Sequence, residues 1–127
     1  DYRATSVATQ KLKRRGGRLT LDLDATPDIL AATRGARRPN AVVVGFALET
    51  SDGEAHARAK LAAKALDLIV LNYATEPGAG FGVDTNRVTL FDAAGGAEPL
   101  ALMPKRDVAD AILDRVERLL VARGVTA

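Results

Sequence analysis

The stretch from Ala41 to Thr50, Ala-Val-Val-Val-Gly-Phe-Ala-Leu-Glu-Thr, constrains the fold more than any other part of the chain. Valines dominate it, and no polar residue alternates with the apolar ones before Glu49. This pattern is typical of a central strand that is buried on both faces of a parallel sheet. Gly45 would allow a backbone or a ligand to approach the carboxyl end of that strand, where open α/β sheets bind small molecules. The sequence therefore predicts a ligand site just beyond Phe46.

A second apolar run, Leu68 to Leu71, follows a segment over 51–66 that is rich in alanine, leucine and lysine. We predict a helix over that segment, with Leu61, Ala65 and Leu68 on one stripe. The order strand, helix, strand implies a crossover between parallel strands, which would bring Glu49, Thr50 and Asn72 to one edge of the sheet. The elements predicted downstream are a mobile loop over 75–86, a strand over 87–91, a turn over 92–97, a returning hairpin strand over 98–103, and an amphipathic helix over 105–123 that Gly124 ends.

The segment between residues 19 and 35 predicts a strand followed by a helix. Residues 19–24 alternate apolar and polar side chains, which indicates a half-exposed strand. Thr26 is a good N-cap, Pro27 suits the first helical position, Asp28 would lie in the first turn, and Gly35 would end the helix. The segment is either an ordinary capped helix or a helix whose free amide groups contact a ligand. That ligand would be a nucleoside rather than a phosphate, because Asp28 would repel a phosphate.

Charge is concentrated near the amino terminus, although the net charge of the 127 residues is only +2. Residues 1–18 contain six basic side chains against the single acid Asp1. This segment is either a solvated basic arm or a phosphate-binding arm, and nucleic acid is less favoured because no aromatic residue interleaves the cluster. Lys60 and Lys64 are four residues apart, so they either carry solvated charge or point two ammonium groups over the strand ends. For His56, too, a solvated side chain is the ordinary expectation.

Composition excludes several classes of site. The chain has no cysteine and a single histidine, which excludes disulfides and thiol nucleophiles and argues against a histidine-rich metal site or a serine triad. Any metal should have oxygen ligands. No apolar run approaches the length of a membrane span and no signal peptide is visible, so a cytoplasmic protein is expected. A start at Asp1 rather than methionine suggests a segment of a longer protein or a processed product.

Six motifs taken together resemble the carboxy-terminal half of bacterial phosphopantothenate–cysteine ligase, over essentially the whole chain. They are Asp1-Tyr2-Arg3, the Lys-x-Lys-Arg of Lys11 to Arg14, Thr26-Pro27-Asp28-Ile29-Leu30, Val44-Gly45-Phe46-Ala47-x-Glu49-Thr50, Ala59-Lys60-Leu61-x-x-Lys64-x-x-Asp67, and Phe81-Gly82-x-Asp84-x-Asn86. The fold expected from pattern and resemblance is α/β, a Rossmann-like three-layer sandwich whose mainly parallel sheet carries a β-hairpin extension. One incomplete domain over 1–127 is expected, with a basic flap over 1–18.

The resemblance implies that the carboxylate of 4'-phosphopantothenate attacks the α-phosphate of CTP and releases pyrophosphate. The amine of L-cysteine then captures the acyl-cytidylate, which gives an amide and CMP. Such chemistry requires cations and Mg²⁺ around the triphosphate. The resemblance implies these roles: triphosphate binding and catalysis by Lys11, a flap with Lys13 and Arg14, a cytidine pocket of Pro27, Asp28, Ile29 and Leu30, nucleotide packing by Phe46, phosphate contacts from Lys60 and Lys64, and a polar nucleotide contact from Asp1.

Departures from the family pattern also matter. Thr26 replaces the usual asparagine before Pro27, and Tyr73 follows Asn72 where relatives commonly have aspartate. The amino-terminal half of the ligase domain and the decarboxylase domain that holds FMN are absent from these residues, so we expect this chain alone to be inactive. The resemblance also implies a homodimer, and the Lys-x-Lys-Arg flap favours CTP over ATP. The alternatives are a non-catalytic nucleotide-binding or nucleic-acid-binding module, and a chain that serves only dimer assembly through residues 75–86.

Overall fold

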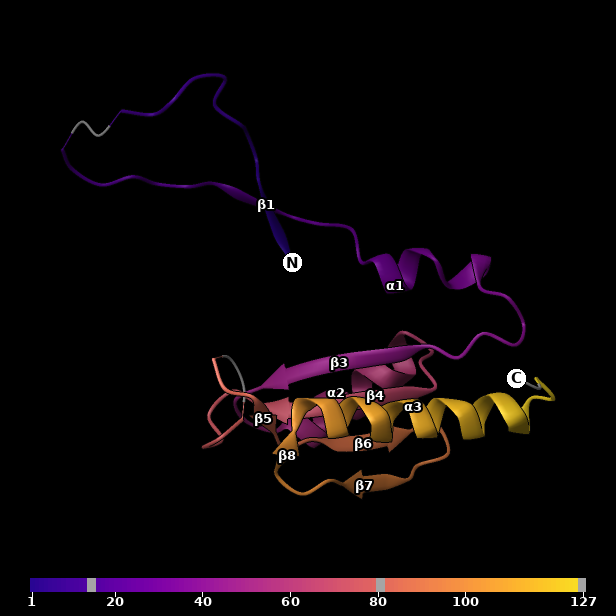
Figure 1. The fold of residues 1–127 in the computed structure, drawn as a ribbon. Coiled ribbons are helices and arrows are strands. Elements are labelled where there is room, and N and C mark those ends of the chain that lie inside the picture. Colours follow the sequence, from indigo (N-terminus) through magenta and orange to yellow (C-terminus); the bar gives the residue numbers. More distant parts are fainter. Residues whose placement is uncertain (14–15, 80–81, 126–127) are drawn as a thin grey trace. The chain divides into compact units, whose positions relative to one another are not determined.

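A computed structural model describes residues 1–13, 16–79 and 82–125. The chain divides into two compact units, Asp1–Gly35 and Ala36–Ala127. Figure 1 shows the helices and strands of both units.

The first unit is built on a short antiparallel ladder. Strand β1, Tyr2–Ala4, pairs with β2, Leu23–Ala25, and backbone hydrogen bonds from Thr5 to Asp22 and from Thr26 to Asp1 extend the pairing at both ends. The strand predicted over 19–24 is therefore wrong in its bounds, because only its last two residues pair. It is also exposed rather than half-exposed: Leu19 and Leu21 are 73% and 67% exposed. A two-stranded ladder offers no core face on which alternating leucines could be buried.

A single turn of helix follows, α1 over Ile29–Ala32, and a 3₁₀ turn, η1, over Arg34–Ala36. The prediction that Thr26 caps this helix is wrong. Asp28 is the N-cap, with extended backbone, and its Oδ1 accepts a hydrogen bond from the backbone N of Ala31 at 3.1 Å. Both residues are good caps. The choice of Asp28 moves Pro27 outside the helix and starts the helix two residues later. The prediction that Gly35 ends this helix is also wrong, because α1 ends at Ala32 with Thr33 as its C-cap, and Gly35 lies within η1.

The second unit contains a mixed four-stranded sheet in the order β3-β4-β6-β7. The strands of the sheet are β3 over Val44–Glu49, β4 over Leu68–Tyr73, β6 over Thr89–Asp92 and β7 over Ala97–Pro99. The pair β3–β4 is parallel, whereas β4–β6 and β6–β7 are antiparallel. A second, two-stranded ladder joins β5, Thr85–Asn86, to β8, Met103–Pro104. The helices are α2 over Gly53–Ala63 and α3 over Lys105–Ala122.

Helices α2 and α3 cover opposite faces of this sheet (Figure 1). Successive side chains of a strand point to opposite faces, and β4 is buried on both. One face forms the core cluster of Leu68, Val70, Val88, Leu90, Val108 and Ile112, the last two from α3. The other face contributes Ile69 and Leu71, and α2 buries Ala57 toward it. The three-layer α/β sandwich and the crossover between parallel strands are confirmed.

Strand β3 differs from the prediction in its bounds, in its burial and in the role of Gly45. It begins at Val44 rather than Ala41 and ends at Glu49, so a position just beyond Phe46 falls within the strand and not at its carboxyl end. Among the described strands it lies at the edge of its sheet, and Phe46 is 70% exposed, so the expected burial on both faces is wrong. Gly45 stands near the start of the strand, where a Cβ would approach Cδ1 of Leu66 to 2.5 Å. The glycine makes room for a core leucine rather than for a ligand.

Other helices and strands also begin or end at residues that differ from the predicted ones. Helix α2 ends at Ala63, and Ala65 has a left-handed φ of 46°, so the stripe that included Ala65 and Leu68 leaves the helix after Leu61. The predicted loop over 75–86 ends in β5, and its Gly80 and Phe81 lie outside the described residues. The predicted strand over 98–103 is divided between β7, which pairs with β6, and β8, which pairs with β5. The hairpin and α3, with Gly124 just beyond it, are confirmed.

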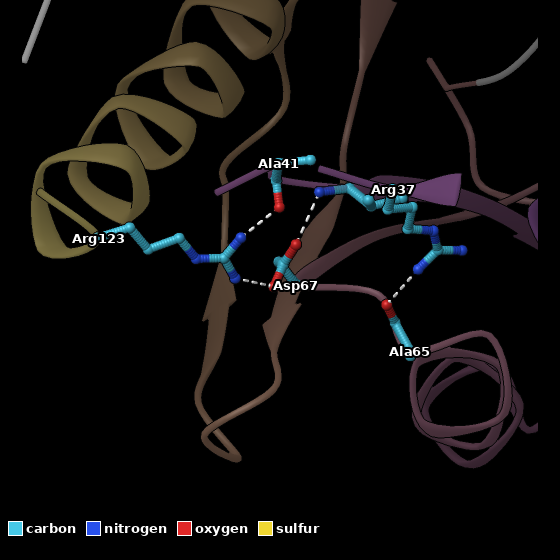
Figure 2. Close-up of polar contacts among 6 residues, drawn as sticks. Arg37, Ala41, Ala65, Asp67 and Arg123 are labelled. Atoms are coloured by element: carbon cyan, nitrogen blue, oxygen red, sulfur yellow. Dashed lines mark hydrogen bonds and ion pairs between the residues drawn. The ribbon is translucent and has the colours of Figure 1, made fainter. Parts of the chain in front are cut away.

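A polar cluster ties both ends of the second unit to the start of β4 (Figure 2). Asp67 accepts a hydrogen bond from the backbone N of Val43 at 2.7 Å and forms an ion pair with Arg123, which also donates to the carbonyl oxygen of Ala41. Arg37 donates to the carbonyl oxygen of Ala65 at 2.7 Å. The segment that leads into β3 is thereby fixed between the end of α2 and the end of α3.

Candidate functional site

The carboxyl edge of the parallel pair is built by the end of β3, the end of β4 and the start of α2. Glu49 and Tyr73 are register partners, and the carbonyl oxygen of Glu49 accepts a hydrogen bond from the backbone N of Ala74 at 2.9 Å. Asp52 adopts a left-handed φ of 49° that turns the chain into α2. Gly53 is buried there, and a Cβ on it would lie 2.7 Å from the hydroxyl oxygen of Tyr73. The close turn therefore depends on a glycine beneath the tyrosine ring.

The side chain of Glu49 joins two basic side chains from α2. Its Oε1 lies 2.5 Å from Nζ of Lys60, and its Oε2 lies 3.2 Å from Nδ1 of His56. Side chains of a helix tilt toward its amino terminus, so Lys60 reaches back from the second turn of α2 to the strand end. The Glu49 side chain is only 14% exposed, whereas that of Lys60 is 44% exposed. A sheltered carboxylate thus holds an accessible ammonium group.

The Glu49 carboxyl is shifted toward its ionised form. The hydrogen bond from Lys60 lowers its pKa most, partial burial opposes this by raising the pKa, and His56 lowers it further. An ionised carboxylate only accepts hydrogen bonds, so Nδ1 of His56 must carry the hydrogen of that contact. The ammonium group of Lys60 has three N–H donors, so the bond to Glu49 leaves two of them for another oxyanion.

Other predicted site residues of this unit lie on β3 and at the far end of α2. Phe46 presents an exposed aromatic side chain on β3 that could stack on a planar ligand. Lys64 is the C-cap of α2, its backbone N bonds to the carbonyl oxygen of Lys60 at 3.0 Å, and its own carbonyl oxygen accepts from Arg37 at 3.1 Å. Lys64 therefore follows the last turn of α2, one turn beyond Lys60.

The predicted site residues of the first unit are Asp1 with the cytidine pocket, and the basic residues of the flap. The carbonyl oxygen of Asp1 accepts a hydrogen bond from the backbone N of Thr26 at 3.0 Å, so the β1–β2 ladder brings Asp1 beside the start of the predicted cytidine pocket. In that pocket Asp28 uses its carboxylate as the helix cap, and Ile29 is 73% exposed. Lys11 and Lys13 are exposed in the segment between the two strands. Arg14 lies outside the described residues.

Sequence reasoning placed Glu49 at the sheet edge but missed that it pairs with Lys60, and it missed the packing of Tyr73 over Gly53. The eleven-residue spacing of Glu49 and Lys60 was the available signal, because a strand end and the second turn of the following helix lie within reach of a lysine side chain.

Among residues 1–13, 16–79 and 82–125, no group of three or more histidine, aspartate or glutamate side chains is arranged to hold a metal ion. None of the described helices is long and apolar enough to cross a membrane.

Comparison with known proteins identifies similar sequences and folds. The family model for the DNA/pantothenate metabolism flavoprotein C-terminal domain matches residues 1–120. The coenzyme A biosynthesis bifunctional protein CoaBC of Bacillus subtilis (strain 168) is 45% identical over 124 residues, which cover 98% of this chain and 30% of that protein. The protein of the same name from Escherichia coli (strain K12) is 38% identical over 119 residues, 91% of this chain and 29% of that protein.

A solved structure, the C-terminal domain of coenzyme A biosynthesis bifunctional protein CoaBC, matches with a TM-score of 0.72 and 31% identity. The match covers 96% of this chain and 50% of that domain. The chain thus spans about a third of the length of these relatives and half of the solved domain.

Proposed function

The chain belongs to the family of the DNA/pantothenate metabolism flavoprotein C-terminal domain, and we propose that it forms part of a CTP-dependent phosphopantothenate–cysteine ligase in coenzyme A biosynthesis. The observation that carries the proposal is the ammonium group of Lys60, held at the carboxyl edge of a parallel strand pair in a chain 45% identical to a CoaBC protein. Such edges are where open α/β sheets bind ligands.

The reaction proceeds in two balanced steps. A carboxylate oxygen of 4'-phosphopantothenate bonds to the α-phosphorus of CTP, and pyrophosphate leaves. The amine of L-cysteine then attacks the acyl carbon, loses a proton, and expels CMP, which keeps the former carboxylate oxygen. In the first step negative charge builds on phosphate oxygens, where fixed cations lower the barrier most effectively.

The residues of this chain supply cations, a base pocket and an aromatic surface. Lys11 serves the triphosphate in the transition state, with Lys13 and Arg14 beside it on the flap, and Lys60 and Lys64 contact phosphate oxygens. Pro27, Asp28, Ile29 and Leu30 line the cytidine pocket, where Asp1 adds a polar contact, and Phe46 packs on the nucleotide. Mg²⁺ would accompany CTP and offset the negative charge of its phosphates. FMN belongs to a decarboxylase domain of the longer protein, and the ligase acts as a homodimer in the cytoplasm.

CTP rather than ATP is the proposed substrate. The proposed cytidine pocket of residues 27–30 would pair polar groups with the edge of a pyrimidine, and each hydrogen bond left unmade by the wrong base costs about 1 to 3 kcal/mol. Competition between the two nucleotides at equal Mg²⁺ tests the choice. An affinity for ATP that equals or exceeds that for CTP would contradict it.

The reaction itself is tested with purified full-length protein that contains this chain. Formation of phosphopantothenoylcysteine and CMP should require all three substrates, and the 127-residue chain alone should give neither product. A non-catalytic nucleotide-binding module would bind CTP without forming the amide. A nucleic-acid-binding module would instead bind polyanions of many sequences with an affinity that falls steeply with salt. Either result with the full-length protein would replace the proposal.

A further inference from the structure

We propose that Glu49 is a positioning residue for the nucleotide: its carboxylate holds the ammonium group of Lys60 in place while two N–H donors stay available to phosphate oxygens. The inference deepens the proposed function and rests on it. It concerns the contact between the end of β3 and the second turn of α2, where Nζ of Lys60 lies 2.5 Å from Oε1 of Glu49.

Glu49 is suited to this role because its backbone is fixed on two sides. It is the last residue of β3, in register with Tyr73 of β4, and its carbonyl oxygen accepts a hydrogen bond from Ala74. Lysine, by contrast, has a flexible four-carbon stem that samples many rotamers when it is unpaired. The strand end therefore acts as a rigid anchor for a side chain that would otherwise be mobile.

The second carboxylate oxygen of Glu49 is also occupied. Nδ1 of His56, one helical turn before Lys60, lies 3.2 Å from Oε2. Two partners on two oxygens fix the plane of the carboxylate and hence the direction in which Lys60 is held. The pKa of Glu49 is lowered, first by the hydrogen bond from Lys60, so the anchor is ionised at neutral pH.

Two other roles for Glu49 predict different results. A carboxylate that competes with phosphate for Lys60 would have to be displaced by the nucleotide, so its removal would tighten binding. A purely structural ion pair would contribute to stability, so its removal would lower the melting temperature while the affinity of the folded protein for Mg·CTP stayed unchanged. A positioning residue acts through Lys60 alone, so its effect must vanish when Lys60 is absent.

The experiment measures the affinity of Mg·CTP calorimetrically in full-length protein that contains this chain, for Glu49→Ala, Glu49→Gln, Lys60→Ala and the double variant Glu49→Ala/Lys60→Ala. We expect Glu49→Ala to weaken binding about tenfold, as the loss of a hydrogen bond to a charged group would. Glu49→Gln keeps an acceptor oxygen and should lose less. The double variant should bind no more weakly than Lys60→Ala alone. Glu54→Ala is the matched control, because Glu54 is an α2 carboxylate paired with Arg58 at 2.9 Å, and its removal should leave the affinity unchanged.

Unchanged or tighter binding by Glu49→Ala would overturn the positioning role, as would an equal loss in the Lys60→Ala background. Melting temperatures of the same variants separate a general loss of fold from the specific effect. Wild-type protein that fails to bind Mg·CTP would overturn the proposed function instead, and with it this inference. The two failures are distinguishable because the second is visible without any substitution.

Discussion

Gly45→Ala should destabilise the protein, although it adds a single methyl group to a strand. A Cβ at this position would lie 2.5 Å from Cδ1 of Leu66, while Cγ1 of Ile69 would be at an ordinary 3.7 Å. Leu66 is only 4% exposed, so its side chain cannot turn toward solvent without leaving the core. The added methyl group must therefore displace a packed leucine.

Two terms of opposite sign set the size of this effect. Alanine in a strand is favoured over glycine by about 0.5 to 1 kcal/mol, since the unfolded chain loses less freedom on folding. Overpacking a well-filled core costs about 1 to 3 kcal/mol. The two terms leave a net loss between about 0 and 2.5 kcal/mol, and because the contact involves the end of a side chain rather than backbone, we expect about 1 kcal/mol.

Urea unfolding of the wild type, Gly45→Ala, Leu66→Ala and the double variant measures both the loss and its cause. Leu66→Ala alone should cost about 2 to 5 kcal/mol. In that background Gly45→Ala should be neutral or stabilising, because the methyl group enters the space that the leucine left. Gly35→Ala is the control, since its Cβ would meet nothing within 4 Å. A variant at position 45 as stable as wild type, or a loss that persists without Leu66, would refute the packing argument.

Three further outcomes concern charged side chains. Lys11→Gln in the full-length protein should raise the activation free energy by about 3 kcal/mol or more while the free energy of unfolding changes by less than about 0.5 kcal/mol, and parallel losses in kinetics and thermal melts would make Lys11 structural. Asp67→Ala should lower the free energy of unfolding by about 1 to 3 kcal/mol, because it leaves Arg123 and the backbone N of Val43 without their shared partner; an unchanged urea midpoint would contradict this. The pKa of Glu49 is lowered in the folded chain, so the stability that its ionised form contributes is present above the ordinary carboxyl pKa and is lost as the pH falls through the lowered value. The difference in free energy of unfolding between wild type and Glu49→Gln should therefore shrink over that pH range. A difference that stays constant would argue against the Glu49–Lys60 ion pair.

The elements that could be predicted from the sequence are those with an unambiguous period or length. Leu68 to Leu71 reads as a fully buried strand because all four residues are apolar, and each is at most 2% exposed. The helical spacing of Val108 and Ile112, with Gly124 beyond, gave the bounds of α3 to within one residue. In both cases local pattern and core packing agree.

Where the sequence interpretation failed, two local solutions were equally acceptable. Thr26 and Asp28 both suit an N-cap on either side of Pro27, and only the folded chain shows which carboxylate or hydroxyl reaches an amide. The apolar run around Phe46 fits a central strand, but the position of a strand within a sheet depends on its neighbours. Exposure of Phe46 therefore could not be read from its own segment.

The candidate site was predictable in part. The prediction that Glu49 and Asn72 lie at one edge of the sheet is confirmed, since the carboxyl ends of β3 and β4 are adjacent. The partner of Lys60 was not indicated, because an exposed lysine on a helix is usually solvated. The roles of Asp1, Lys11 and the residues 27–30 rest on family resemblance, and their variants must be tested in a longer protein.

The most direct test of the proposed ligase is the fate of one oxygen atom. Full-length protein would be supplied with CTP, L-cysteine and 4'-phosphopantothenate labelled with ¹⁸O in its carboxylate, and the CMP would be analysed by mass spectrometry. Attack of the carboxylate on the α-phosphate predicts one ¹⁸O atom in each CMP molecule formed. Amide formation with unlabelled CMP would contradict an acyl-cytidylate, and with it the central claim about this site.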